Sequence, residues 1–145
     1  MKSMVVYDSV SGNTKQIAEA IGRALGEDAK VYRPDVIDGT ALRNVDLLVI
    51  GSPTYGGKPT ESVTRLIDRI IPTLPAGIMV AAFDTRLKMR FVRIFGFAAD
   101  KIAAAFAQKG AQVVGTKGFI VKGRTGPLAE GEVERASSWG RQLAR

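Results

Sequence analysis

The sequence predicts a doubly wound α/β fold, a three-layer sandwich in which helices cover both faces of one parallel sheet. Two observations support this. Short runs rich in Val, Ile and Leu alternate with amphipathic helical stretches along the chain, an order typical of parallel sheets. The 145 residues contain no internal repeat or linker and fit one domain. We therefore expect residues 1–145 to form a single domain with five parallel strands.

Five apolar runs predict the strands. The clearest, DLLVIG, is apolar almost throughout, as expected of a strand buried on both faces. Pro34 follows the second run and favours an edge position for it. We expect the fifth run to kink at Gly115 or Gly118. The runs are Lys2–Tyr7, Ala29–Arg33, Asp46–Gly51, Gly77–Phe83 and Gln112–Lys122.

Between these runs, apolar residues recur at the three- and four-residue spacing of a helix. In the first helix Ile17, Ile21 and Leu25 keep this spacing, and Gly26 is a stop signal. The predicted helices are Asn13–Leu25, Thr60–Ile71, Ala98–Gln108 and Glu130–Leu143, with a helical turn at Thr40–Asn44. The stretch from Asp84 to Phe97 favours no single assignment.

The composition excludes several chemistries. Without Cys the chain has no disulfide, no thiolate nucleophile and no Cys-bound metal cluster. Without His it has no Ser-His-Asp triad and no His-ligated metal, and we expect no metal site. Any redox chemistry must therefore come from a bound organic cofactor.

The net charge is +7, from 21 Lys and Arg against 14 Asp and Glu, and the pI is about 10.0. Such a charge suits an acidic partner, a nucleic acid or an anionic membrane. No RNA-binding motif or zinc finger is present, so we expect no nucleic-acid partner. No apolar run approaches the roughly 18–20 residues that span a bilayer. The stretch from Met1 to Asp8 is too short and too soon polar for a signal peptide, so we expect none. We expect a cytoplasmic protein.

The loop DSVSGNT (residues 8–14), between the first strand and the first helix, predicts a phosphate site. Its hydroxyls alternate with Gly12 and Asn13, and its N–H groups lie at a helix N-terminus, where the helix dipole favours anions. It contains no Lys or Arg, so neutral groups would hold the phosphate. The alternative is an ordinary helix cap, but a cap needs one hydroxyl rather than three. Neither the nucleotide P-loop motif nor a dinucleotide glycine fingerprint is present.

This loop resembles the phosphate loop of flavodoxins, and a second block, IGSPTYGGKP (residues 50–59), resembles the flavodoxin loop that wraps one side of the flavin ring. The resemblance covers the whole chain in element order and suits the short-chain type. It implies strand order 2-1-3-4-5 and one noncovalently bound FMN. It also implies that Ser9, Ser11, Gly12, Asn13 and Thr14 hold the phosphate, and that Pro53, Thr54, Tyr55, Gly56 and Gly57 flank the ring.

In flavodoxins the peptide equivalent to Gly56–Gly57 flips on reduction, and its carbonyl accepts a hydrogen bond from flavin N5–H. Two glycines should make that flip inexpensive. Tyr55 offers a flat face to the ring. The alternative is a plain Gly-Gly turn with a surface Tyr.

The loop expected after the fourth strand departs from the family pattern, because it lacks the Tyr that many flavodoxins place there. The resemblance leaves Phe83, Asp84 and Thr85 to line the pyrimidine edge through backbone N–H groups. We expect Arg86 near flavin N1 and O2, where it would raise the potential of the reduced state; a solvated loop Arg is the alternative.

Segment 86–97 interleaves four cations with seven large apolar residues. Three interpretations stay open: a loop packed on the sheet, a docking surface for an acidic redox partner or a quinone-like acceptor, and contact with anionic lipid. The basic turn 122–127 resembles a structural connection of flavodoxin-like proteins.

The resemblance predicts an electron carrier. One alternative is an FMN-dependent oxidoreductase, either an NAD(P)H:quinone reductase or a protoporphyrinogen-oxidase-like enzyme, that docks its acceptor on segment 86–97. Another is a binding module that has lost the flavin. The oligomeric state stays open between monomer and homodimer.

Overall fold

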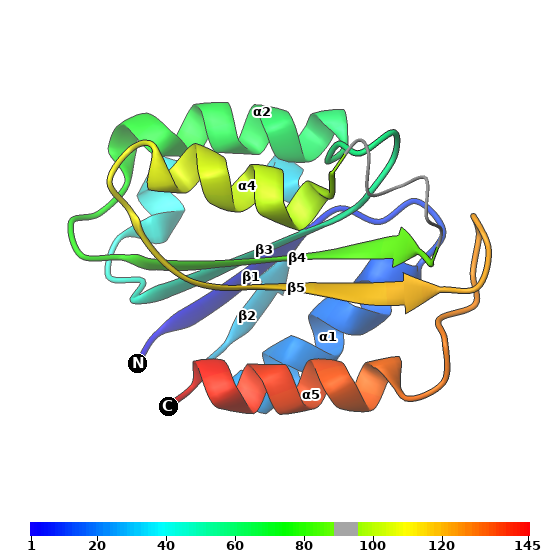
Figure 1. Ribbon diagram of the computed structural model, residues 1–145. Coiled ribbons are helices and arrows are strands. Elements are labelled where there is room, and N and C mark those ends of the chain that lie inside the picture. The colour runs from blue at the N-terminus through cyan, green and yellow to red at the C-terminus, as the bar shows by residue number, and fades with distance from the viewer. Residues whose placement is uncertain (89–95) are drawn as a thin grey trace.

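The computed structural model describes residues 1–88 and 96–145. Its five strands form one all-parallel sheet in the order β2-β1-β3-β4-β5 (Figure 1), as predicted. The short strand β2 lies at one edge, where Pro34 predicted it, and β5 lies at the other. The strands are β1 (Ser3–Tyr7), β2 (Lys30–Tyr32), β3 (Leu47–Pro53), β4 (Met79–Leu87) and β5 (Gln112–Val121).

Helices cover both faces of the sheet. In Figure 1, α2 and α4 lie above it, and α1 and α5 lie below it. The helices are α1 (Asn13–Leu25), α2 (Glu61–Ile70), α4 (Ala98–Ala107) and α5 (Glu132–Leu143). Three 3₁₀ turns lie at Pro34–Val36, Gly39–Leu42 and Ile71–Thr73. The predicted three-layer α/β fold is confirmed.

The buried strands contribute side chains to two hydrophobic cores, one between the sheet and each pair of helices, because successive side chains of a strand point to opposite faces. In β3, Leu48 and Ile50 pack on the α2 and α4 side. Leu47 and Val49 pack on the α1 and α5 side. All four side chains are fully buried, which explains why the sequence of this strand is apolar without alternation.

The fourth strand is longer than predicted. It runs to Leu87 rather than ending at Phe83, so the expected loop 84–86 is strand, and that part of the prediction is wrong. β3 and β5 pair with this extension on both sides, through Thr85 opposite Pro53 and Leu87 opposite Val121. The polar residues Asp84, Thr85 and Arg86 suggested a loop, but their side chains form hydrogen bonds within the fold.

The kink expected in the fifth strand is present near Gly115. The register with β4 shifts by one residue there: Val80 pairs with Val113, whereas Ala81 pairs with Gly115, leaving Val114 as the extra residue of a bulge. Beyond this bulge, β5 continues to Val121 alongside the extended β4. Both strands therefore deliver residues to the carboxyl end of the sheet.

Candidate cofactor-binding site

A cleft of about 370 Å³ opens at the carboxyl end of the sheet, where ligands of doubly wound folds bind. Loops after β1, β3 and β5 and the last residues of β4 surround it. The lining residues are Ser9, Val10, Ser11, Asn13, Thr14, Pro53, Thr54, Tyr55, Gly56, Gly57, Thr85, Arg86, Leu87, Val121 and Arg124. The structure thus brings together both sequence blocks that resemble flavodoxin loops.

The loop after β1 holds its shape through its own hydrogen bonds. The Gly12 N–H donates to Ser9 Oγ at 3.0 Å, and the Ser9 N–H donates to Asp8 Oδ1 at 2.9 Å. The Arg33 guanidinium donates to the same carboxylate and to the Ser9 carbonyl, at 3.0 and 3.1 Å. Gly12 takes a φ of 92°, a left-handed conformation that glycine adopts without strain. The loop therefore enters α1 already folded.

Helix α1 begins at Asn13, and the N–H groups of a first helical turn have no intrahelical acceptor. They face an approaching ligand together with the positive end of the helix dipole, which favours anions. Gly12 caps this end without a side-chain hydrogen bond. The loop can therefore offer several N–H groups to one anion.

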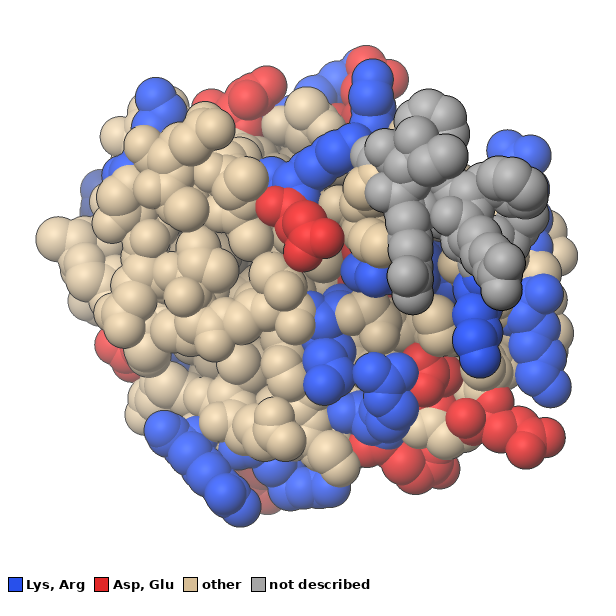
Figure 2. All heavy atoms as spheres, viewed as in Figure 1, with Lys and Arg blue, Asp and Glu red and all other residues tan. Residues whose placement is uncertain are grey.

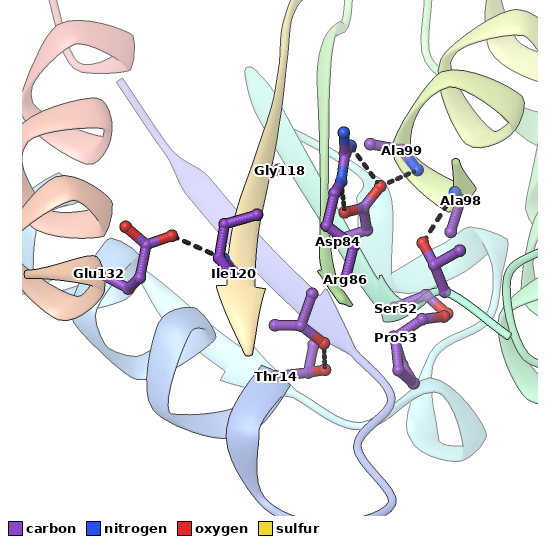
Figure 3. Close-up of polar contacts among 12 residues, drawn as sticks. Thr14, Ser52, Pro53, Asp84, Arg86, Ala98, Ala99, Gly118, Ile120 and Glu132 are labelled. Carbon is purple, nitrogen blue, oxygen red and sulfur yellow. Dashed lines mark hydrogen bonds and ion pairs between the residues drawn. The ribbon is translucent and has the colours of Figure 1, made fainter. Parts of the chain in front are cut away.

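A buried hydrogen bond joins α1 to β4 under the cleft. Thr14 Oγ1 and Thr85 Oγ1 lie 2.8 Å apart, and their residues are only 2% and 4% exposed (Figure 3). The Thr54 N–H donates to the Thr85 carbonyl at 2.9 Å, so the same β4 residue also holds the loop after β3. Thr85 thus ties the two sides of the cleft together.

The residues Tyr55–Lys58 form a tight turn on one wall of the cleft. The N–H of each end residue donates to the carbonyl of the other, both at 3.0 Å. Gly56 and Gly57 have φ of 57° and 76°, and two positive φ values at the central positions define a type I′ turn. The two adjacent glycines of the sequence therefore have a structural reason, because glycine takes both positive φ values at little cost.

The N-terminus of α4 is fastened to two strand ends beside the cleft (Figure 3). The Ala98 N–H donates to Thr54 Oγ1 at 3.0 Å, and the Ala99 N–H donates to Asp84 Oδ2 at 2.9 Å. The helix has no side-chain cap from its own N-cap residue Phe97. Residues of neighbouring strands therefore take the place of that cap.

Asp84 forms a two-point ion pair with Arg86, at 2.7 and 2.8 Å (Figure 3). The carboxylate is fully buried, and burial raises the pKa of Asp84 above its ordinary value, although Arg86 opposes this shift. The guanidinium carbon of Arg86 lies 3.5 Å from the centroid of the Phe97 ring. Arg86 lines the cleft from within β4 rather than from a loop, and its guanidinium is paired with Asp84. Its expected position near flavin N1 and O2 stays a prediction.

Phe83 and Asp84 are not among the residues that line the cleft, and their predicted contact with the pyrimidine edge through backbone N–H groups stays a prediction. Phe83 is fully buried under the sheet and makes edge-to-face contacts with Phe119 and Trp139. Asp84 points to the opposite face, toward α4. Both lie within β4, so alternation along the strand sends their side chains into the two cores. Gly12 is also predicted as a site residue and is also absent from the lining, and it is the residue that precedes α1.

Sequence reasoning missed four lining residues: Val10, Leu87, Val121 and Arg124. Arg124 belongs to the basic turn 122–127, which the sequence suggested to be only structural. Its guanidinium carbon lies 5.9 Å from the centroid of the Tyr55 ring. The signal available was topological: the carboxyl ends of all strands of a parallel sheet lie at one edge, so the loop after β5 starts at the edge that holds this cleft.

Part of segment 86–97 lies outside the described residues, namely 89–95. The interpretations of that segment as a docking surface or a lipid contact therefore stay predictions. Among residues 1–88 and 96–145, no helix is long and apolar enough to cross a membrane. The same residues contain no cluster of acidic side chains that could bind a metal ion.

Comparison with known proteins supports the resemblance. An uncharacterized protein from Methanocaldococcus jannaschii is 34% identical over 74 residues, which are 50% of this chain and 48% of that protein. This chain therefore matches about half the length of that relative.

Two solved structures share the fold over nearly the full length. A flavodoxin from the domain Archaea superposes with a TM-score of 0.80 and 24% identity, covering 99% of this chain and 96% of the other. Oxidised flavodoxin 2 from Bacillus cereus superposes with a TM-score of 0.78 and 24% identity, covering 99% of this chain and 98% of the other. The flavodoxin family profile matches residues 5–139. Flavodoxins bind FMN and transfer electrons, and this chain belongs to the flavodoxin family.

Proposed function

We propose that this chain holds one FMN noncovalently in the cleft and carries electrons between redox partner proteins. The observation that carries the proposal is the cleft itself, which places the anion-binding start of α1 opposite the type I′ turn of Tyr55–Lys58. Membership of the flavodoxin family supports the same cofactor.

The residues around the cleft fit the three parts of FMN. The N–H groups and hydroxyls of residues 9–14 suit a phosphate dianion. Thr54 and Thr85 offer polar groups to the sugar-like chain. Tyr55, which is 36% exposed, and Leu87 offer apolar surface to a planar ring. When bound, FMN supplies the redox chemistry, because no Cys or His is present in the sequence.

The Gly56–Gly57 peptide is the protein group that we assign to respond to reduction. Turning its plane over converts a type I′ turn into type II′, in which Gly56 keeps a positive φ and Gly57 takes a negative one. The flip would present the Gly56 carbonyl oxygen as an acceptor for a flavin N–H. The two hydrogen bonds between Tyr55 and Lys58 do not involve that peptide, so the flip leaves the ends of the turn in place.

The charge around the cleft suits an acidic partner. Among the described parts of the loops after β1, β3, β4 and β5, the exposed cations are Lys58, Lys88, Lys122 and Arg124. The same parts of these loops carry only two carboxylates, Asp8 and Glu130, and Asp8 is paired with Arg33 from the loop after β2. Figure 2 shows Lys and Arg side chains on the right-hand side, where the strands of Figure 1 end, with acidic side chains below them.

Salt dependence tests this partner. We expect the reduced protein to transfer electrons faster to a small acidic haem protein than to a small basic one at low ionic strength, and added salt to slow the transfer to the acidic protein. A faster reaction with the basic protein would contradict the proposed partner.

A carrier and a reductase differ in one simple assay. A carrier loaded with FMN should relay electrons from a reductase to an acceptor protein, yet oxidise NADH or NADPH with a quinone hardly at all. Rapid direct oxidation of NAD(P)H would overturn the carrier. The family and the structural neighbours favour the carrier.

A further inference from the structure

Arg124 is a cation at the cleft, and no described residue pairs with it as an opposite charge. It is exposed, follows β5 and lines the same cavity as Ser9, Ser11 and Thr14. Within residues 1–88 and 96–145, no carboxylate forms an ion pair with its guanidinium, which lies over the Tyr55 ring.

Two other arginines of the described residues near the cleft are already paired with carboxylates. Arg33 is paired with Asp8 at 3.0 Å, and Arg86 is paired with Asp84 at 2.7 Å. The loop 8–14 itself contains no Lys or Arg. Burying a phosphate dianion against neutral groups alone is costly, because each charge loses hydration that only an opposite charge or strong hydrogen bonds replace. Of the two described cations that line the cleft, Arg86 is paired with Asp84, and Arg124 keeps its charge available for a ligand.

The turn that carries Arg124 is packed against the start of α1. A Cβ built on Gly126 would lie 2.6 Å from Asn13 Oδ1, so the backbone of this turn touches that side chain directly. The turn is closed by the Gly126 N–H donating to the Gly123 carbonyl and the Lys122 N–H donating to the Pro127 carbonyl. The backbone that carries Arg124 is therefore held beside the start of α1.

We propose that Arg124 supplies the counter-charge for the phosphate of FMN, and that this chain thereby discriminates FMN from riboflavin more strongly than its neutral loop would alone. The inference rests on the proposed function, because it assumes that FMN occupies the cleft. It replaces the sequence expectation that neutral donors carry the phosphate by themselves.

The test measures the dissociation constants of FMN and riboflavin by quenching of flavin fluorescence, at low and high ionic strength. Arg124→Ala should weaken FMN binding about five- to tenfold at low salt, the size expected for one partly exposed charge-assisted contact, and should change riboflavin binding less than about twofold. Arg124→Lys should retain most of the affinity, because it keeps the charge. High salt should reduce the loss in Arg124→Ala.

Lys122→Ala is the matched control, since Lys122 is an exposed cation of the same turn that does not line the cleft. Its FMN affinity should stay within about twofold of the parent. Equal losses of FMN and riboflavin in Arg124→Ala would place the guanidinium on the ring and overturn the inference. Unchanged FMN binding, or an equal loss in Lys122→Ala, would overturn it as well. If the parent protein itself bound no FMN, the proposed function would fail instead.

Discussion

The buried ion pair of Asp84 and Arg86 is predicted to respond unequally to the loss of its two members. Asp84 is fully buried, whereas the Arg86 side chain keeps 19% of its surface exposed. Arg86→Met leaves a buried carboxylate without its cation. Asp84→Asn leaves a cation that can still reach water, and the Asn oxygen can still accept from the Ala99 N–H. The first change should therefore cost much more stability than the second.

Breaking a buried ion pair by removing one partner typically costs about 3–5 kcal/mol. We expect Arg86→Met to lose about 3 kcal/mol of unfolding free energy at pH 7, since Met retains the packing on Phe97. Asp84→Asn should lose only about 1 kcal/mol, because burial already penalises the ionised form. Urea unfolding of the flavin-free protein measures both. Asp68→Asn, which removes an exposed carboxylate from α2, is the control and should change stability by less than about 0.5 kcal/mol.

The loss in Arg86→Met should also depend on pH. Burial holds the pKa of Asp84 above the unfolded value of 3.8, and removing the Arg86 charge raises that pKa further. Because the pKa of Asp84 is higher in the folded protein than in the unfolded chain, its protonated carboxyl stabilises the fold fully below pH 3.8. This stabilisation is lost as the pH rises through the pKa of Asp84 in the folded protein. The difference between Arg86→Met and its parent should therefore widen as the pH rises from about 4.

Two results would refute this reasoning. One is an Asp84→Asn variant that is less stable than Arg86→Met at pH 7. The other is a stability difference for Arg86→Met that stays constant with pH. A double-mutant cycle adds a check, since Arg86→Met should cost at least about 1.5 kcal/mol less when Asp84 is already Asn.

Three further predictions concern the loops and the edge strand. Ser11→Ala combined with Thr14→Ala should weaken FMN far more than riboflavin; equal losses by fluorescence titration would exclude the phosphate role. Gly57→Ala should raise the reduction potential of bound FMN, because Ala disfavours the φ of 76° by about 1 kcal/mol and favours the flipped turn; a lower potential in a redox titration would contradict the assigned flip. Glu132→Ala should lose about 2 kcal/mol in thermal unfolding, since its buried carboxylate accepts a β5 N–H at 2.6 Å, whereas exposed Glu134→Ala should be nearly neutral; similar losses would deny the carboxylate a special role.

Local sequence signals predicted most of the fold. Helix α1 has the predicted bounds Asn13–Leu25, because a left-handed Gly12 begins it and Gly26 ends it. The strand order followed from the family resemblance, and the apolar runs located every strand. The tight turn after β3 was visible as two adjacent glycines, which a type I′ turn requires.

Contacts between distant segments decided the features that were missed. The extension of β4 beyond Phe83 depends on a threonine pair 71 residues apart and on an ion pair covered by α4. A local pattern of polar residues contains neither contact. Arg124 joins the cleft only because the loop after β5 packs on Asn13. In each case the sequence showed the chemical type of the residue, but it did not show which distant residue it would contact.

Titration of the flavin-free protein with FMN, followed by its visible absorption spectrum, tests the central claim most directly. The account predicts saturation at one FMN per chain, with a perturbed flavin spectrum, and weaker binding of riboflavin. The bound flavin should then accept and release electrons reversibly during stepwise reduction. Absence of any bound flavin, at FMN concentrations well above those that saturate other flavodoxins, would contradict the account and leave a binding module that has kept only the fold.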